Sequence, residues 1–176
     1  MPSLLLVGFM GAGKSTVGSA LAARLDCTFE DLDQRIERRE GQTVAEIFRN
    51  SGEAHFRRAE RAALRELLGE LRGGVKKVVA LGGGAFAQTA NAGLIEANGI
   101  PTLFLDAPAE ELWRRCCEQS RDQGTQRPLL NSLESFRKLY EVRRPKYLTA
   151  SLRQDTSGKD VAGIVADIVE ALDRLR

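Results

Sequence analysis

The sequence is poor in the residues that most often hold metals or form disulfides. Among its 176 residues it has one histidine, His55, and three cysteines, Cys27, Cys116 and Cys117. None of them lies in a Cys-x-x-Cys pair or a cysteine–histidine cluster, so a zinc site is not expected. We expect His55 to be an ordinary, partly exposed side chain of a helix. An odd number of cysteines, two of them adjacent, is a poor disulfide framework and indicates a reducing compartment.

A long apolar run and a large net charge are also missing. No run of apolar residues approaches the roughly 18 that a membrane-spanning helix needs. No basic residue precedes the first short apolar run, Leu4–Val7, which argues against a signal peptide. The 26 basic and 24 acidic residues leave a net charge of +2, too little for a general nucleic-acid binder. We therefore expect a cytoplasmic protein with no nucleic-acid and no membrane partner.

The composition, 43% hydrophobic and 28% charged, suits one globular domain over residues 1–176. Short apolar runs predict strands, and longer amphipathic segments between them predict helices. The expected strands are residues 4–7, 27–29, 78–81, 102–105 and a weak one at Leu152. The expected helices are residues 14–25, 33–72 (broken near Gly41 and Gly52), 109–117, 132–144 and 161–175. Apolar strands joined by helices indicate an α/β fold, in which helices cover both faces of a parallel sheet.

Ligands of such sheets bind at the carboxyl ends of the strands. The segments that follow the expected strands are residues 8–15, 31–33 and 82–84, together with Asp106. These segments are the first places to look for a functional site.

The first of these segments, Gly-Phe-Met-Gly-Ala-Gly-Lys-Ser at residues 8–15, matches the phosphate-binding pattern G-x-x-x-x-G-K-[ST] in full. It lies between an expected strand and an expected helix, as the P-loop does. Its glycines let backbone N–H groups converge on phosphate oxygens, and the helix N-terminus adds positive potential there. We expect Lys14 to reach the β- and γ-phosphates and the Ser15 hydroxyl to bind Mg²⁺. The residues predicted to bind the nucleotide here are Gly11, Ala12, Gly13, Lys14, Ser15 and Thr16.

Other motifs narrow the class of P-loop protein. The D-x-x-G pattern of GTPases occurs only at residues 155–158, near the C-terminus, and N-K-x-D is absent. The short chain also argues against a motor or a transporter ATPase. A small kinase remains, which needs an acceptor hydroxyl.

Several further segments resemble those of shikimate kinases, and they occur in the same order. They are Phe29-Glu30-Asp31-Leu32-Asp33 with Ile36-Glu37, then Ile47-Phe48, Gly52-Glu53, Phe56-Arg57-x-x-Glu60, Gly82-Gly83-Gly84-Ala85, Arg127-Pro128-Leu129-Leu130 and Arg143-x-Pro145-x-Tyr147. The resemblance covers essentially the whole chain. It implies a P-loop kinase three-layer sandwich with a five-stranded sheet of order 2-3-1-4-5 and a mobile lid. It also implies ATP-dependent phosphorylation of the shikimate 3-hydroxyl, with Mg²⁺ as cofactor, in aromatic amino acid biosynthesis.

Two carboxylates follow the second expected strand. Asp31 and Asp33 are two residues apart, so in an extended chain they point to the same side. We expect Asp31 to lie near the metal. Asp33 is expected to accept a hydrogen bond from the acceptor hydroxyl and orient it, and the resemblance implies that it contacts the hydroxyls of shikimate.

Two arginines are candidates for binding the carboxylate of the acceptor, because a guanidinium pairs with a carboxylate through two parallel hydrogen bonds. The resemblance selects Arg57 and Arg143 for this role. Their neighbours Arg58 and Arg144 are equally basic, so only the motif alignment chooses between them. Gly82, Gly83 and Gly84 allow close backbone approach, and their N–H groups are expected to hold a substrate oxygen.

Residues 118–131 are expected to form the lid, because they include a long polar segment. At its end, Arg127 would close over the phosphates and neutralise developing charge. Arg115 and Lys159 are candidates for bordering the adenine.

Two alternatives stay open at this point. One is another small-metabolite kinase of the gluconate kinase type, and the other is a non-catalytic ATP-binding module. The intact Lys14, Ser15, Asp33 and Arg127 favour an active enzyme. We expect a monomer whose partners are ATP and shikimate.

Overall fold

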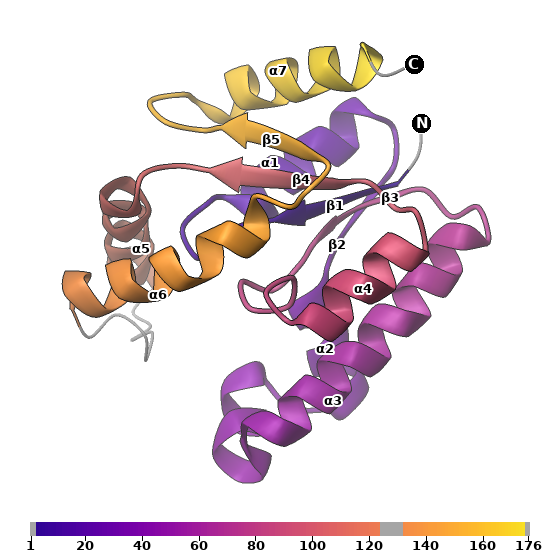
Figure 1. The fold of residues 1–176 in the computed structure, drawn as a ribbon, viewed down its shortest axis with the longest axis vertical. Helices are drawn as coiled ribbons and strands as arrows, with labels where there is room; N and C mark the ends of the chain where they lie inside the picture. Colours follow the sequence, from indigo (N-terminus) through magenta and orange to yellow (C-terminus); the bar gives the residue numbers. More distant parts are fainter. Residues whose placement is uncertain (1–2, 124–131, 175–176) are drawn as a thin grey trace.

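The computed structural model describes residues 3–123 and 132–174 (Figure 1). Its helices and strands alternate along the chain. In chain order they are β1 (Leu4–Val7), α1 (Lys14–Arg24), β2 (Thr28–Asp31), α2 (Leu32–Glu40), α3 (Val44–Arg72), β3 (Lys77–Ala80), α4 (Thr89–Ala97), β4 (Thr102–Asp106), α5 (Ala109–Gln123), α6 (Leu133–Tyr147), β5 (Leu152–Asp155) and α7 (Val161–Asp173).

In the described residues the strands form one five-stranded sheet of order β2-β3-β1-β4-β5. Every neighbouring pair is parallel, so all carboxyl ends lie at one edge of the sheet. The central strands β1 and β4 are buried along their whole length, as expected of a parallel sheet covered on both faces. The predicted α/β class, parallel sheet and strand order are confirmed.

Helices cover both faces of this sheet. On one face, α1 comes so close that a Cβ on Gly18 would lie 2.5 Å from the ring of Phe29 and 3.0 Å from Leu6. On the other, the ring of Tyr147 in α6 lies 5.3 Å from that of Phe104 in β4. Leu6 is aligned with Leu103, and successive side chains of a strand alternate between faces, so α1 and α6 lie on opposite faces.

Helices α2 and α3 pack against each other and are separated by a break that the sequence predicts. Gly41 ends α2 in the left-handed conformation, with φ of 67°. Thr43 and Glu46 then start α3 with a reciprocal capping box. Inside α3, Gly52 departs from helical geometry, with φ of 78° and ψ of 172°, and the helix kinks there. Both predicted breaks, near Gly41 and near Gly52, are confirmed.

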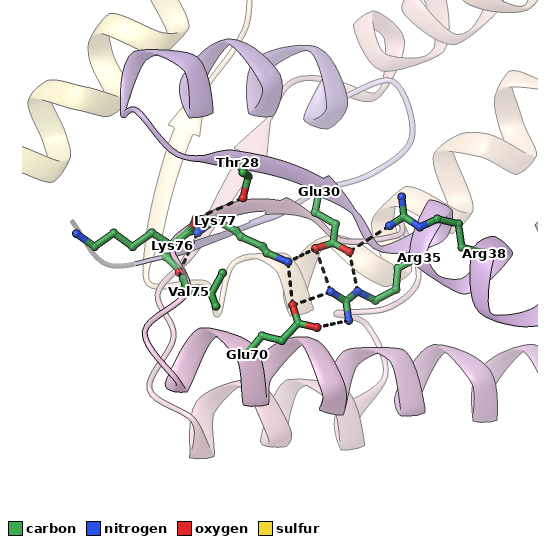
Figure 2. A network of polar contacts seen from close by, with 9 residues as sticks. Thr28, Glu30, Arg35, Arg38, Glu70, Val75, Lys76 and Lys77 are labelled. Atoms are coloured by element: carbon green, nitrogen blue, oxygen red, sulfur yellow. Dashed lines mark hydrogen bonds and ion pairs between the residues drawn. The ribbon is translucent and has the colours of Figure 1, made fainter.

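A network of five charged side chains, Glu30, Arg35, Arg38, Glu70 and Lys77, joins the edge of the sheet to these helices (Figure 2). Arg35 of α2 pairs with Glu30 of β2 at 2.7 Å and with Glu70 of α3 at 2.8 Å. Lys77 of β3 pairs with the same two carboxylates, at 2.7 and 2.8 Å. Hydrogen bonds from Arg35, then from Lys77, lower the pKa of Glu70 to about 2. The network fixes the start of α2 against the sheet, close to Asp31 at the end of β2 and Asp33 in α2.

Several boundaries differ from the predicted ones. Helix α4 is not expected from the sequence, since it is short, contains Gly93 and buries only Asn91 and Ile95. Helix α5 runs on to Gln123, so the first six residues of the predicted lid are helical. The ion pair of Arg114 with Glu118, at 2.7 Å and one turn apart, supports this extension.

The predicted helix 132–144 stops before Pro145, because proline lacks the N–H that an interior helix position donates. Helix α6 nevertheless continues through Pro145 to Tyr147. The backbone N–H of Leu148 donates to the Arg144 carbonyl at 3.0 Å, so helical bonding resumes after the proline. This extension matters, because it places Tyr147 beside the glycine segment 82–84. Across residues 3–123 and 132–174, none of the helices combines the length and the apolar character that crossing a bilayer requires.

Candidate active site

A cavity of about 480 Å³ opens at the carboxyl ends of the strands. The P-loop forms one wall, and α2, α3, the glycine segment 82–84 and α6 form the others. Among the side chains that line it are Lys14, Ser15, Thr16, Asp31, Asp33, Arg57, Glu60 and Arg143, with Gly11, Gly13, Gly82, Gly83 and Gly84 contributing backbone. The segments that the sequence singled out after the first three strands thus meet in one place.

The P-loop has the backbone conformation that phosphate binding requires. Gly11 and Gly13 have φ values of 78° and 80°, in the left-handed region that favours glycine. Gly11 also packs tightly, since a Cβ there would lie 2.4 Å from the carbonyl oxygen of Leu112. Gly13 begins α1, and no side chain in the described structure caps that helix. Its first N–H groups and the positive end of its dipole are therefore directed at the cavity.

Lys14 lies across the P-loop. Its Nζ donates hydrogen bonds to the carbonyl oxygens of Gly8 and Phe9, each at 3.0 Å. These bonds hold the ammonium group over the loop, at the wall where the phosphates of a nucleotide would lie. Ala12 is buried and does not line the cavity.

Ser15 and Asp31 join the P-loop to the end of β2. The Ser15 hydroxyl donates to Oδ2 of Asp31 at 3.0 Å. The other carboxylate oxygen of Asp31 caps α2 by accepting from the N–H of Asp33 at 2.9 Å. A hydroxyl and a carboxylate side by side, both oxygen donors, fit Mg²⁺, which is usually held by one or two protein oxygens together with phosphate and water. No cluster of three or more potential metal ligands occurs in the described residues, so they offer no all-protein metal cage.

Asp33 lies deeper in the same wall. Asp31 and Asp33 do not share the extended segment that the sequence predicted, because Asp31 ends β2 and Asp33 is in the first turn of α2. Both residues nevertheless line the cavity. Oδ1 of Asp33 is buried and accepts no hydrogen bond from the described residues. Burial, assisted by the neighbouring charge of Asp31, raises the pKa of Asp33 to about 6.

Arg57 is held rigidly by two carboxylates of its own helix. Nη1 donates to both oxygens of Glu60, at 3.1 and 3.2 Å, and Glu60 is only 1% exposed. Nε and Nη2 donate to Glu53 at 3.3 and 3.2 Å. The fork between Nη1 and Nη2 faces Gly84, because a Cβ there would lie 3.1 Å from both nitrogens. Arg58 is exposed on another face of the helix and does not line the cavity.

Arg143 enters the cavity from α6. Its Nη1 donates to the carbonyl oxygen of Gly83 at 3.5 Å, and its guanidinium lies 5.8 Å from the centre of the Phe9 ring. The hydroxyl of Tyr147 donates to the same carbonyl. Arg144 instead turns away and pairs with Asp106 at 2.7 Å. The structure thus separates the arginine pairs that the sequence left open.

Among the described residues, three predicted ones do not line the cavity: Ala12, Arg115 and Lys159. Arg115 donates to the carbonyl oxygen of Thr156 at 2.9 Å and to its hydroxyl at 3.1 Å. Lys159 pairs with Asp167 at 2.6 Å on the surface of α7. Their contact with adenine stays a prediction. Arg127 lies outside the described residues, as does the lid segment 124–131.

Other residues of the cavity were missed by the sequence analysis. Phe48 and Phe56 line it with rings 4.7 Å apart, on either side of the kink at Gly52. Phe48 is 39% exposed, and a large apolar side chain beside the acidic residues could have indicated a ligand-facing role. Glu37 and Gln119 also line the cavity, and no sequence feature distinguished them from other surface residues.

The chain is similar to known proteins along nearly its whole length. Residues 10–173 match the family model for shikimate kinase. A shikimate kinase of Persephonella marina is 38% identical over 170 residues, which is 96% of this chain and 98% of that protein. One of Thiobacillus denitrificans is 41% identical over 178 residues, covering 99% and 92%.

Solved structures give the same result. The shikimate kinase of Acinetobacter baumannii in complex with shikimate has a TM-score of 0.85 at 33% identity, covering 100% of this chain and 95% of that one. The shikimate kinase of Aquifex aeolicus has a TM-score of 0.82 at 32% identity, covering 97% and 96%. A gluconokinase of Sinorhizobium meliloti, at 18% identity and a TM-score of 0.62, shares the fold alone.

Proposed function

The chain belongs to the shikimate kinase family, and from this membership we propose how its residues divide the work of phosphorylating shikimate with ATP. The enzyme transfers a phosphoryl group from ATP to an alcohol, a step of aromatic amino acid biosynthesis. One observation carries the assignment of residues. A single cavity joins a P-loop, an aspartate with one buried carboxylate oxygen and two arginines, which are the groups that a phosphate donor and a hydroxylated acid need.

The P-loop wall binds the donor. The N–H groups of residues 11–16 and the N-terminus of α1 hold the phosphates, and Lys14 moves from the loop carbonyls to the terminal phosphates when they arrive. Ser15 and Asp31 would hold Mg²⁺, which supplies a positive charge that offsets charge on the phosphate oxygens. We assign to Arg127 the neutralisation of charge that develops on the phosphates. Arg115 and Lys159 are assigned to the edge of the adenine.

Asp33 positions the acceptor. Its unpartnered Oδ1 accepts a hydrogen bond from the hydroxyl that is phosphorylated and directs that oxygen toward the donor. With a pKa of about 6, the carboxylate is largely ionised at neutral pH and can accept this bond. Phosphoryl transfer gains most from positioning and charge, so Asp33 need not be a strong base.

Arg57 and Arg143 hold the carboxylate of shikimate. The fork of Arg57 faces Gly84, and Arg143 is bound to the carbonyl of Gly83, so both guanidinium groups converge on the glycine segment. Backbone N–H groups of residues 82–84 also bind a substrate oxygen. The shikimate complex of the Acinetobacter baumannii relative supports a small hydroxylated acid in this cavity.

Water must be kept from competing for the phosphoryl group. We assign this task to the lid, residues 118–131 of a single domain that spans residues 1–176. Gln119, in the helical part of that segment, already lines the cavity from α5. Closure of the lid would therefore start from a residue that already lies at the cavity. Closing the cavity also strengthens the electrostatic interactions inside it.

The chain is assigned a monomeric state and a cytoplasmic location. One chain supplies the P-loop, Asp33 and both arginines to the cavity, which supports a monomer. None of the three cysteines forms a disulfide, which suits a reducing compartment.

A coupled assay of ADP release tests the proposal. The purified protein is supplied with ATP, Mg²⁺ and shikimate, and in parallel with gluconate or no acceptor. Of these three assays, only the one with shikimate is expected to show turnover. The Lys14→Ala variant should show none. Turnover with gluconate but not shikimate would instead favour a gluconate kinase. ATP binding without turnover on either acid would favour a non-catalytic module.

A further inference from the structure

We propose that Asn91, a buried residue of α4, is a positioning residue for the acceptor and acts on Arg57 through Glu60. This inference rests on the proposed role of Arg57 in holding the substrate carboxylate. Asn91 does not line the cavity, and it contacts no group that we have assigned to the reaction. Its importance comes from what its side-chain nitrogen holds in place.

Asn91 is 2% exposed, and its Nδ2 donates two hydrogen bonds. One goes to Oε2 of Glu60 at 3.3 Å, and the other goes to the carbonyl oxygen of Ala85 at 3.1 Å. Both partners are acceptors. The reverse orientation of the amide would place its oxygen against two oxygens, so the nitrogen must face them.

The other polar atom of this amide, Oδ1, indicates why this position is an asparagine. Oδ1 of Asn91 is buried and has no hydrogen-bond partner in the described residues. An unpartnered buried acceptor is costly, and a residue that only filled space in α4 would avoid that cost by being apolar. The two donated bonds are therefore the feature that an asparagine supplies here.

Glu60 needs such a donor. Its carboxylate is almost fully buried, and burial raises its pKa. Nη1 of Arg57 contacts both of its oxygens, and Nδ2 of Asn91 also donates to Oε2. A carboxylate held by two donor side chains has a fixed orientation, so the guanidinium that it binds has one too.

The second bond of Asn91 extends the effect to the glycine segment. Ala85 directly follows Gly84, the residue that the fork of Arg57 faces. The N–H of Ala85 closes the turn by donating to the carbonyl of Gly82 at 3.0 Å. Nδ2 of Asn91 thus binds both the Glu60 carboxylate, which holds Arg57, and the carbonyl of Ala85, which follows the glycine that Arg57 faces. It therefore sets the distance between Arg57 and the glycine segment, where the substrate carboxylate is held.

Steady-state kinetics of Asn91→Asp and Asn91→Ala test this role. The aspartate is nearly isosteric but presents oxygen to two acceptors, and the alanine removes both bonds. Each should raise the KM for shikimate by about tenfold, the effect of one lost hydrogen bond to a charged group. The KM for ATP should stay within about twofold of wild type, because the P-loop wall is untouched.

Asn98→Asp is the matched control. Asn98 lies at the C-terminal end of the same helix and donates to the carbonyl of Leu94 at 2.7 Å. It should leave both KM values unchanged. Thermal melting checks that each variant folds, and Asn91→Ala decides alone if Asn91→Asp does not fold.

A double-mutant cycle separates positioning from a general loss of structure. In an Arg57→Ala background, substitution of Asn91 should change kcat/KM for shikimate little further, because the residue it acts through is gone. Additive losses, equal rises in both KM values, or a shikimate KM within about twofold of wild type would each overturn the inference. An unchanged shikimate KM in Arg57→Ala alone would instead overturn the assignment of Arg57.

Discussion

Arg143 and Arg144 are neighbours on α6, yet their guanidinium groups serve different parts of the molecule. Arg143 reaches the carbonyl of Gly83 in the cavity, whereas Arg144 pairs with the buried carboxylate of Asp106 at the end of β4. Asp106 also accepts from the Tyr140 hydroxyl at 2.7 Å. Because successive helix residues point about 100° apart, fixing Arg144 to the sheet fixes the direction in which Arg143 leaves the helix.

This division predicts opposite effects of two neighbouring substitutions. Arg143→Ala should raise the shikimate KM by roughly ten- to a hundredfold, because it removes a charge-assisted contact to the substrate. Arg144→Ala should leave that KM within a few-fold and lower the free energy of unfolding by about 1 kcal/mol, a value reduced for partial exposure. Kinetics and urea unfolding of both variants check this. The reverse pattern would show that the two roles are exchanged.

Asp33 should give the reaction an acidic limit. Its pKa is raised to about 6, so kcat/KM for shikimate should fall as pH drops below that value and the carboxylate gains a proton. A pH profile of kcat/KM measures this limb. A profile that is flat down to pH 5 would contradict the assignment.

The same raised pKa has a consequence for stability. Between its ordinary value of 3.8 and about 6, the folded protein binds the proton more tightly than the unfolded chain. The contribution of Asp33 to stability is therefore lost as pH rises through this range. Asp33→Asn, which carries no charge, should be more stable than wild type at pH 7 by about 1–3 kcal/mol, while its kcat falls by orders of magnitude. Thermal unfolding at pH 4 and pH 7 should show the difference at the higher pH alone.

Two glycines predict opposite outcomes of the same substitution. Gly11→Ala places a Cβ 2.4 Å from the Leu112 carbonyl at a residue with φ of 78°, so it should destabilise the protein by several kcal/mol and abolish ATP binding. Gly93→Ala in α4 meets no atom within 4 Å and should stabilise it by about 0.5–1 kcal/mol. Differential scanning calorimetry with and without ADP compares them. Equal melting temperatures would contradict the tight packing of the P-loop on α5.

The charge network at the sheet edge should depend on pH and salt. The pKa of Glu70 is lowered to about 2 by Arg35 and Lys77, so its stabilising contribution is present above its ordinary value of 4.5 and is lost as pH falls toward 2. Glu70→Gln should cost about 1 kcal/mol at pH 7, a value reduced because Glu70 is partly exposed. The difference from wild type should shrink in 1 M salt and vanish below pH 2. A difference that persists there would indicate packing rather than charge.

The sequence predicted the parts of this enzyme that are local. The P-loop, the breaks at Gly41 and Gly52 and the apolar strands each depend on a few consecutive residues. The strand order and the choice of Arg57 and Arg143 came from the family resemblance, because nothing in their own neighbourhoods separates them from Arg58 and Arg144. For the second pair the structure supplies the reason, which is a long-range contact. Asp106 forms an ion pair with Arg144, and this turns Arg144 away from the cavity.

Other features could not be predicted, because they depend on contacts between distant segments. Helix α4 has little amphipathic pattern, and Asn91 is meaningful only once α3 lies beside it. The pairing of Arg115 with Thr156 joins residues 41 positions apart. Asp33 was correctly placed in the cavity for a wrong local reason, since a helical turn rather than an extended chain presents it.

The kink at Gly52 divides the wall that α3 contributes to the cavity. Phe48 lies before the kink, and Phe56 and Arg57 lie after it, so one helix brings aromatic rings and a cation to the cavity from both sides of the kink. The backbone torsions of that one glycine therefore fix the angle between the two parts of α3 that line the cavity. A substitution that changed these torsions would displace Phe48 relative to Arg57, and so would reshape the cavity while the cation stays in place.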